Sequence, residues 1–225
     1  MKLALFDLDH TLLDGDSDDL WYRFLAEQGV VDGAHFIAER ARFSADYRAG
    51  RLKVLDFYNF VLKPLAENPS QQLHAWRRRF VMERILPRIT PAARALLAKH
   101  RTAGHTLAII TATNRFITEP IAAELGVQHL LATEPEHDGT HFTGRVSGVP
   151  CFREGKLIHL QEWLHRENLV PMETWFYSDS HNDLPLLESV NHPAAVNPDA
   201  VLAQTALERH WPILHIRRET VMAAH

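Results

Sequence analysis

The sequence predicts an α/β fold, in which a mostly parallel sheet is covered by helices on both faces. Short apolar runs with the length of buried strands recur along the chain, at residues 3–6, 107–110, 130–132, 175–177, 194–196 and 213–216. Between most of these runs lie segments with helical periodicity and recognisable ends. Strands that alternate with helices are typical of a parallel sheet whose ligands collect at the carboxyl ends of its strands.

The helices of this predicted core are marked at their ends by residues with clear local roles. Thr90 and Pro91 open one helix, because threonine is a common N-cap and proline is tolerated in the first turn, and Gly104 closes it. Residues 114–126 and 154–168 predict two further helices. We expect these segments to connect one strand of the sheet to the next.

The alternation is interrupted between Gly15 and about Leu86. This stretch contains no convincing strand, but it has several amphipathic helical segments, at residues 18–28, 34–49, 54–67 and 71–85. We therefore expect two units. Residues 1–15 and 87–225 would form the core domain, and residues 16–86 would form an inserted helical cap.

A second, smaller interruption lies within residues 134–152. Asp138-Gly139 stands there between Glu136 and Phe142, and this dipeptide favours the tight turn of a hairpin. We therefore expect a small β-hairpin beside the sheet.

Composition and charge exclude several classes of function. The chain has 225 residues, with 24 Lys and Arg against 28 Asp and Glu, and its net charge of −4 argues against binding to nucleic acid or to an anionic membrane. Its one cysteine, Cys151, has no intrachain partner, and the first residues lack the apolar core of a signal peptide, so we expect a cytoplasmic protein. The fifteen histidines show no metal-ligand spacing. The oligomeric state stays open.

Acidic residues follow two of the predicted strands. Asp7 and Asp9 come at the end of the first strand, and their spacing places both carboxylates on one side of an extended chain. Asp179 and Asp183 follow the strand at 175–177. Carboxylates this close repel each other unless a cation joins them, and oxygen-rich sites of this kind suit Mg²⁺. The sequence therefore predicts a magnesium site held by aspartates.

Two further polar residues complete a set suited to phosphoryl transfer. Thr111 ends the strand at 107–110 just before a helix, where a hydroxyl and free backbone N–H groups can hold phosphate oxygens. Lys156 follows Gly155 near a helix start and supplies a positive charge. A carboxylate nucleophile, a second carboxylate that moves a proton, a metal ion, a hydroxyl and a lysine are the groups that phosphoryl transfer uses.

In chain order, the four motifs are Asp7 with Asp9, Thr111, Lys156, and Asp179 with Asp183. In this order they resemble the motifs of the haloacid dehalogenase superfamily, and the resemblance covers nearly the whole chain. The helical insert directly after the first motif resembles the cap of the phosphoserine-phosphatase-like branch. The resemblance implies a Rossmann-like parallel core with an inserted C1-type helical cap. It also implies hydrolysis of a small-molecule phosphate ester with Mg²⁺ as the cofactor.

The resemblance assigns a role to each motif residue. Asp7 would be the nucleophile that becomes an aspartyl-phosphate, and Asp9 would be the acid that protonates the leaving oxygen and later activates water. Thr111 and Lys156 would bind the phosphoryl group. The metal ligands would be Asp7, the backbone carbonyl of Asp9, and Asp179. Asp183 would not bind the metal directly, but would support the metal-bound waters and Lys156.

Departures from the usual motifs of this branch bear on the substrate. Asp16 aligns with a cap carboxylate that holds the substrate amine in phosphoserine phosphatases. Residues 54–60 lack the arginine that takes the substrate carboxylate there, and Thr111-Ala112-Thr113-Asn114 stands where Ser-Gly-Gly would be usual. The whole-chain pattern is similar to a bacterial subgroup associated with histidinol phosphate, an amine without a carboxylate. We therefore expect histidinol phosphate, from histidine biosynthesis, to be the favoured substrate.

Other interpretations stay open at this point. Asp16 could be the N-cap of the first cap helix, and Asp179 and Asp183 could merely cap the helix that begins near Asn182. Thr113 could touch phosphate or simply start a helix. The substrate could be phosphoserine or another small amine or alcohol phosphate. A phosphotransferase or phosphomutase would use the same aspartyl-phosphate, and a non-catalytic phospho-ligand binding protein could share the fold.

Overall fold

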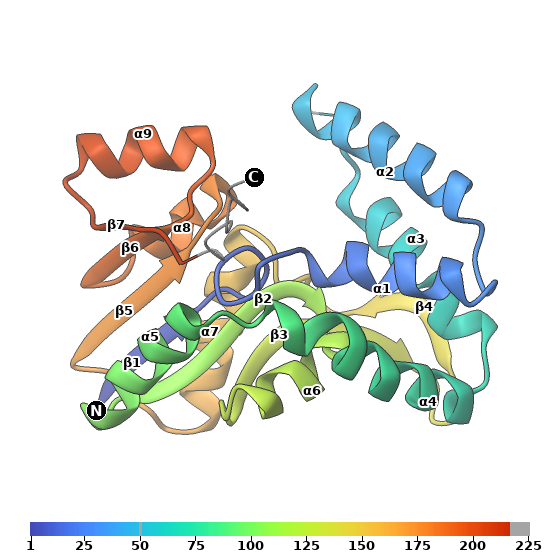
Figure 1. Ribbon diagram of the computed structural model, residues 1–225. Coiled ribbons are helices and arrows are strands. Elements are labelled where there is room, and N and C mark those ends of the chain that lie inside the picture. Colours follow the sequence, from blue (N-terminus) through green and yellow to red (C-terminus); the bar gives the residue numbers. More distant parts are fainter. Residues whose placement is uncertain (50, 217–225) are drawn as a thin grey trace, which may run out of the picture.

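A seven-stranded sheet lies at the centre of the structure, with the strand order β4-β3-β2-β1-β5-β6-β7. The computed structural model describes residues 1–49 and 51–216. The strands are β1 (Lys2–Phe6), β2 (Thr106–Asn114), β3 (His129–His137), β4 (Phe142–Ser147), β5 (Glu173–Ser178), β6 (His192–Val196) and β7 (Ile213–Leu214). All neighbouring strands are parallel except β3 and β4, which are antiparallel (Figure 1). The mostly parallel sheet expected from the sequence is confirmed.

Helices cover both faces of this sheet. α5 (Pro91–Thr102) and α6 (Arg115–Glu124) pack on one face, and α7 (Glu154–Arg166), α8 (Leu184–Leu187) and α9 (Ala200–Glu208) pack on the other. Phe6 of β1 belongs to the apolar cluster under α5 and α6, whereas Leu5 belongs to the cluster under α7, α8 and α9. Successive side chains of a strand point to opposite faces, so a strand this apolar needs cover on both sides.

The helix ends expected from the sequence are present. Thr90 caps α5, since its hydroxyl accepts a hydrogen bond at 3.1 Å from a backbone N–H three residues on, and the chain leaves this helix through Gly104 with a φ of 72°. Asn114 caps α6 in the same way. β2 ends at Asn114 and α6 begins at the next residue. Thr111 therefore lies near the carboxyl end of β2, at the edge of the sheet.

Four helices lie between β1 and α5, and the described residues of this insert include no strand. They are α1 (Ser17–Glu27), α2 (Gly33–Arg48), α3 (Val54–Glu67) and α4 (Ser70–Phe80), followed by a π-helical turn, η1 (Val81–Ile85), and a 3-10 turn, η2 (Leu86–Arg88). The helix expected at residues 71–85 therefore widens after Phe80 and does not stay a regular α-helix to its end. α2 and α3 rise above the carboxyl edge of the sheet (Figure 1).

An apolar cluster joins the insert to the rest of the structure. Trp21 of α1 packs edge-on against Phe80 of α4 and Phe116 of α6, with ring centroids 5.1 and 6.1 Å apart. α1 and α4 thus anchor the insert through this cluster. The division into a core of residues 1–15 and 87–225 and a cap of residues 16–86 stays a prediction.

The expected hairpin is formed by the end of β3 and by β4. In its turn the Asp138 carboxylate accepts hydrogen bonds from two backbone N–H groups, both at 2.8 Å, and Gly139 has a φ of 100° that few other residues tolerate. α3 packs so closely on this hairpin that a Cβ at Gly144 would lie 3.2 Å from the Cβ of Ala66. The hairpin therefore supports α3 and, through it, the insert.

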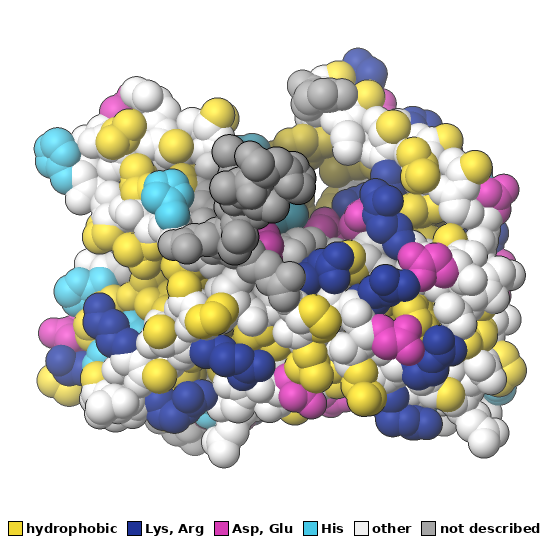
Figure 2. Space-filling model, viewed as in Figure 1, with side chains coloured by type: hydrophobic (Ala, Val, Ile, Leu, Met, Phe, Trp, Pro, Cys, Tyr) yellow, Lys and Arg dark blue, Asp and Glu magenta, His cyan; other side chains and the backbone are white. Residues whose placement is uncertain are grey.

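The charged side chains of the surface are mixed in sign. On the face that Figure 2 shows, basic and acidic side chains are interspersed, as the net charge of −4 leads us to expect. Within residues 1–49 and 51–216, no helix has the length and apolar character needed to cross a membrane.

Gly155 lies where two backbone segments approach closely. A Cβ at this position would lie 2.0 Å from the Pro150 carbonyl oxygen, so the backbone would have to move. Gly155 is the second residue of α7 and directly precedes Lys156. Because Gly155 has no side chain, the start of α7 can lie against the backbone of Pro150, and this contact positions Lys156.

We expect Gly155→Ala to lower the free energy of unfolding by about 2–4 kcal/mol, because no side-chain rotation relieves this overlap. Gly29→Ala is the matched control: Gly29 has a φ of 70°, but a Cβ there meets nothing within 4 Å, so its cost should stay at about 1 kcal/mol. Equilibrium unfolding in urea measures both. Equal losses in the two variants would contradict the steric argument.

Candidate active site

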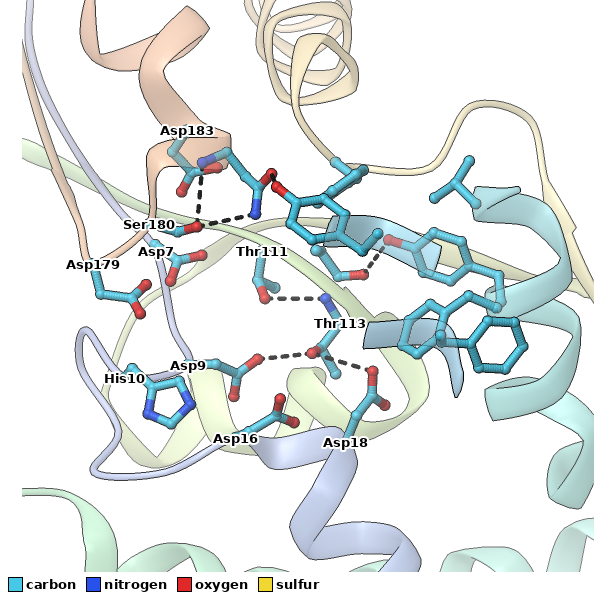
Figure 3. Close-up of a pocket in the computed structure, with 18 of the residues that line it drawn as sticks. Asp7, Asp9, His10, Asp16, Asp18, Thr111, Thr113, Asp179, Ser180 and Asp183 are labelled. Atoms are coloured by element: carbon cyan, nitrogen blue, oxygen red, sulfur yellow. Dashed lines mark hydrogen bonds between the residues drawn. The ribbon is translucent and has the colours of Figure 1, made fainter. Parts of the chain in front are cut away.

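A cavity of about 440 Å³ opens at the carboxyl ends of β1, β2 and β5, between the sheet and the helices α2 and α3. The side chains of the four motifs line its inner end at the sheet edge, here called the floor, and the insert supplies the remaining wall, here called the upper wall. In the view of Figure 3 the labelled motif residues extend from the upper left to the centre, and Asp16 and Asp18 lie at the bottom. The motif residues on the floor are Asp7, Asp9, Thr111, Lys156, Asp179 and Asp183. Parallel strands bring their carboxyl ends to one edge, which is why residues so far apart in the sequence meet here.

Lys156 is a buried ammonium group held between two carboxylates. Its Nζ donates hydrogen bonds to Asp7 Oδ1 at 2.8 Å and to Asp183 Oδ2 at 2.6 Å, and only 3% of its side chain is exposed. Burial alone would lower the pKa of Lys156, but the charges of Asp183 and Asp7 outweigh burial and raise the pKa above its ordinary value. The lysine is therefore a fixed positive charge beside Asp7.

Asp183 binds the lysine and does not cap a helix. Ser178 also donates to Asp183 Oδ2, at 2.6 Å, and the Asp183 side chain makes no capping hydrogen bond to α8, which it precedes. The 3-10 turn η3 (His181–Asp183) is capped by Ser180, whose hydroxyl accepts from the Asn182 N–H. For Asp183, the alternative of a mere helix cap is therefore wrong.

Asp9 is oriented by hydrogen bonds from two other elements. Its Oδ1 accepts from the Ser17 N–H at the start of α1, and its Oδ2 accepts from the Thr113 hydroxyl, both at 2.7 Å. Figure 3 shows the bond from Thr113. Burial, followed by the charge of Asp16, raises the pKa of Asp9 to about 6 in spite of these bonds. A carboxyl group with a pKa close to neutrality is suited both to give and to take up a proton.

Negative charge exceeds positive charge on the floor of the pocket. Asp7, Asp9, Asp179 and Asp183 share the floor with a single lysine, Lys156. Burial raises the pKa of Asp7 to about 7, and burial together with the charges of Asp7 and Asp183 raises the pKa of Asp179 to about 8. Four ionised carboxylates in one desolvated site need a further cation beside them.

These carboxylates fit a divalent cation with oxygen ligands. In the described part of the chain, no group of three or more His, Cys, Asp or Glu side chains is arranged to hold a metal ion by itself. The expected ligand set contains only two such side chains, Asp7 and Asp179, together with the backbone carbonyl of Asp9. Mg²⁺ binds in this manner, through one or two carboxylates and several waters, so the residues present suit it.

Thr111 and Thr113 lie at the end of β2. Thr111 is buried, and its Oγ1 accepts a hydrogen bond from the Thr113 N–H at 3.2 Å. The Thr113 hydroxyl connects two carboxylates, since it lies 2.7 Å from Asp9 Oδ2 and 3.5 Å from Asp18 Oδ2. Sequence reasoning missed this contact, because no local pattern links Thr113 to residues about a hundred positions earlier.

The upper wall of the pocket carries a charged cluster formed by Asp16, Asp18 and Arg40. Asp16 is the N-cap of α1, where its Oδ1 accepts from the Asp19 N–H at 2.8 Å, and its Oδ2 pairs with Arg40 at 3.1 Å. The capping role of Asp16 is confirmed, whereas its role as an amine ligand stays a prediction. Burial, followed by the charges of Asp16 and Asp9, raises the pKa of Asp18 well above its ordinary value.

Sequence reasoning missed Asp18 and Arg40. Both lie within amphipathic helices of ordinary composition, and only the short distance between Asp16 and Asp18 along the chain could have drawn attention to one of them. Their place in the pocket depends on how α1 and α2 are packed, which no local pattern reveals.

Tyr47 of α2 links the upper wall to the sheet edge. Its hydroxyl donates to Asn182 Oδ1 at 2.5 Å and lies 2.7 Å from His181 Nε2, and both of these residues belong to the turn that follows Asp179. Arg153 donates to the same hydroxyl at 3.0 Å. These bonds hold α2 against the turn and narrow the opening of the pocket.

Comparison with known proteins assigns the chain to a family. Residues 4–188 match the family of haloacid dehalogenase-like hydrolases, and this stretch contains the four motifs and the whole helical insert. The chain is a haloacid dehalogenase-like hydrolase. The Rossmann-like fold expected from the motifs is thereby confirmed, since a substrate-bound phosphoserine phosphatase shares it with a TM-score of 0.66 at 18% identity, over 96% of this chain and 93% of that one.

More similar proteins support a phosphatase. The hydrolase is 41% identical over 221 residues to a histidinol-phosphatase from Neisseria meningitidis serogroup C, a match that covers 96% of this chain and 99% of the relative. It is 34% identical over 224 residues to the phosphoserine phosphatase SerB1 of Mycobacterium tuberculosis, over 95% and 70% of the two chains. A crystal structure of a protein of unknown function from Bordetella pertussis Tohama I matches with a TM-score of 0.90 at 42% identity, over 95% and 97%. The hydrolase is a phosphatase.

We expect Asp179→Asn to stabilise the metal-free hydrolase increasingly as the pH rises from about 4 to about 8. The folded-state pKa of Asp179 is raised from 3.8 to about 8, so the folded protein keeps a proton that the unfolded chain releases. The stabilisation from this proton is complete below the unfolded pKa and is lost as the pH rises through the folded pKa. Asparagine does not ionise and escapes this loss.

Urea unfolding in the presence of EDTA, across this pH range, measures the effect. The variant and the wild type should differ little at the acidic end and most at the alkaline end. Asp56→Asn, at an exposed position of α3, is the control and should follow the wild type. A difference between Asp179→Asn and the wild type that does not grow with pH would contradict the expectation.

Proposed function

We propose that this phosphatase is a Mg²⁺-dependent phosphomonoesterase that forms an aspartyl-phosphate on Asp7 and acts on histidinol phosphate. The observation that carries the proposal is the buried Lys156, whose Nζ bonds Asp7 at 2.8 Å inside a cavity that also contains the oriented carboxyl group of Asp9. A phosphate dianion repels a carboxylate nucleophile, and a fixed ammonium group beside that nucleophile offsets the repulsion.

In the first half of the reaction, Asp7 takes the phosphoryl group. A carboxylate oxygen of Asp7 forms a bond to phosphorus, and the bond between phosphorus and the ester oxygen breaks. The leaving oxygen receives the proton of Asp9. With a pKa of about 6, a fraction of the enzyme molecules has Asp9 protonated close to neutral pH. Thr111 and Lys156 hold the phosphoryl oxygens, and the alcohol is released.

In the second half, water removes the phosphoryl group. Asp9, now ionised, accepts a proton from water while the water oxygen bonds to phosphorus and the bond to Asp7 breaks. Inorganic phosphate leaves, and both carboxyl groups return to their starting states. The Ser17 N–H and the Thr113 hydroxyl keep Asp9 in one orientation, so the same group can serve first as acid and then as base.

Mg²⁺ is typical of this family, and the excess of carboxylates on the pocket floor supports it here. Asp7, Asp179 and the backbone carbonyl of Asp9 would hold the ion. When bound, it would neutralise charge on the phosphate oxygens and orient them for attack. Asp183 keeps Lys156 in place beside Asp7, through the hydrogen bond of 2.6 Å.

The upper half of the pocket supports a cationic, aromatic substrate. When Asp18 is ionised, Asp16 and Asp18 exceed Arg40 by one negative charge. Aromatic side chains line the same wall: Phe43, Phe57 and Tyr58. Aromatic faces attract cations and stack with planar rings. Histidinol phosphate has an amine and an imidazole but no carboxylate, and the histidinol-phosphatase of Neisseria meningitidis is 41% identical to this chain.

Phosphoserine is the second candidate, and Arg40 favours it. Residues 54–60 contain no arginine, but Arg40 of α2 lines the pocket and offers a guanidinium group from another helix. This guanidinium already pairs with Asp16 at 3.1 Å, so a substrate carboxylate would have to displace that partner. Histidinol phosphate requires no such exchange and is therefore the preferred substrate.

We further propose that residues 16–86 act as a cap that selects the substrate, while residues 1–15 and 87–225 carry out the chemistry. The upper wall of the pocket comes from α1, α2 and α3, which supports this division of labour. We also propose a cytoplasmic location, since the one cysteine, Cys151, has no intrachain partner with which to form a disulfide.

Asp7→Asn should reduce Mg²⁺-dependent release of phosphate by at least about a thousandfold, because an amide is a poor nucleophile. Asp9→Asn should cause a loss of similar size, since an amide cannot transfer the proton. A colorimetric phosphate assay measures both. Asp14→Asn, in the same loop but outside the cavity lining, is the control and should retain activity. Activity that survives in Asp7→Asn would refute the nucleophile.

A substrate panel tests the choice of ester. We expect the highest kcat/KM for histidinol phosphate, ahead of phosphoserine, phosphoethanolamine and a sugar phosphate, because it matches both the charge and the aromatic wall. EDTA should abolish turnover and added Mg²⁺ should restore it. Equal or absent activity on histidinol phosphate would refute the substrate, and transfer to an added alcohol in preference to water would indicate a phosphotransferase.

A further inference from the structure

Asp16 and Asp18 are close in the sequence but have different surroundings. Both oxygens of Asp16 are engaged, one by the Asp19 N–H at 2.8 Å and one by Arg40 at 3.1 Å. Arg40 is itself held in place, with its guanidinium carbon 5.6 Å from the ring centroid of Phe57. The charge of Asp16 is therefore already paired by Arg40, and a substrate cation gains less there than beside a carboxylate without an ion pair.

The donors that hydrogen-bond to Asp18 are neutral, and Arg40 acts on Asp18 by its charge without a hydrogen bond. It lines the cavity although only 7% of the residue is exposed. Its oxygens receive long hydrogen bonds, from the Asn114 amide at 3.3 Å and from the Thr113 hydroxyl at 3.5 Å, the latter drawn in Figure 3. Among the described residues, the ion pair of Arg40 goes to Asp16 and not to Asp18. A buried carboxylate in this position stabilises a cation that enters the cavity.

The cavity beside Asp18 has an aromatic wall. Phe43 and Phe57 meet edge to face with centroids 5.5 Å apart, and Tyr58 lines the same cavity. When both carboxylates of the cluster are ionised, as a cation beside Asp18 favours, they and Arg40 leave one net negative charge there. A headgroup with one ammonium group on an apolar or aromatic body therefore matches this half of the pocket in charge and in surface.

We infer that Asp18, and not Asp16, receives the ammonium group of the substrate. The inference deepens the proposed function and rests on it, since the phosphate end of the substrate is placed at Lys156 and Thr111. Thr113 lies between the two ends, 2.7 Å from Asp9 Oδ2 and 3.5 Å from Asp18 Oδ2. The ammonium site thus adjoins the carboxyl group that transfers the proton, and the enzyme selects amine phosphates by a buried charge.

Two esters test the inference: histidinol phosphate, and its analogue in which hydrogen replaces the amino group. The readout is the ratio of their kcat/KM values, because a general loss of activity cancels in the ratio. The wild type should prefer the amine by at least about tenfold, and Asp18→Asn should remove at least about tenfold of that preference, since a hydrogen bond to a buried charge is lost.

Three further variants complete the test. Asp18→Glu keeps the charge and should keep most of the preference, which separates the loss of charge from a disturbance of packing. Asp19→Asn makes the same chemical change one residue along the helix, where the side chain pairs with Arg23 outside the cavity, and should leave the ratio unchanged. Asp16→Asn should lower the ratio less than Asp18→Asn does. A ratio that falls in Asp16→Asn but not in Asp18→Asn would overturn the inference.

Binding of L-histidinol, which has no phosphate, separates this inference from the proposed function. Ligand-observed NMR should show line broadening of L-histidinol by the wild type and by Asp19→Asn, but not by Asp18→Asn. If the wild type hydrolyses neither ester and this pattern still appears, the proposal that histidinol phosphate is the substrate fails and the ammonium site stands. Equal broadening by wild type and Asp18→Asn, or none by the wild type, would overturn the ammonium site.

Discussion

The burial of Lys156 between Asp7 and Asp183 is the interaction on which the rest of the site depends. Neither charge is tolerated alone in this place, because a buried ammonium group needs carboxylates and buried carboxylates need a cation. The three side chains come from α7, from the end of β1 and from the turn after β5. One ion-pair network therefore holds three separate elements at the sheet edge, and it places a positive charge beside the nucleophile in the same contact.

A second set of contacts ties the helical insert to the chemistry. The first N–H of α1, from Ser17, donates to Asp9, and Trp21 of the same helix packs into the cluster with Phe80 and Phe116. A shift of α1 would therefore move the hydrogen bond that orients Asp9. The helix that carries Asp18 is the one that positions the proton-transferring group, so the recognition of substrate and the chemistry share a single rigid element.

Much of the architecture was predictable from local patterns. The strands, the caps at Thr90 and Asn114, and the turn at Asp138-Gly139 follow from apolar periodicity and from side chains that bond to nearby backbone groups. The change from α4 to a π-helical turn at residues 81–85 was not predictable, because it arises where the chain adapts to the packing of the insert on the sheet. Local signals describe elements well and their adjustment to one another poorly.

The sequence by itself determined the order of strands and helices along the chain and the helical insert between them. It also determined the motif residues that meet on the pocket floor, because strand ends in a parallel sheet converge on one edge. Only the tertiary structure decided what surrounds each of these residues. Asp16 and Asp18 look alike in the sequence and both line the cavity, yet Asp16 is paired by Arg40 of α2 and Asp18 accepts only from the neutral Thr113 and Asn114. Their partners lie far along the chain, so the packing of α1 against α2 and β2 sets which carboxylate forms the ion pair.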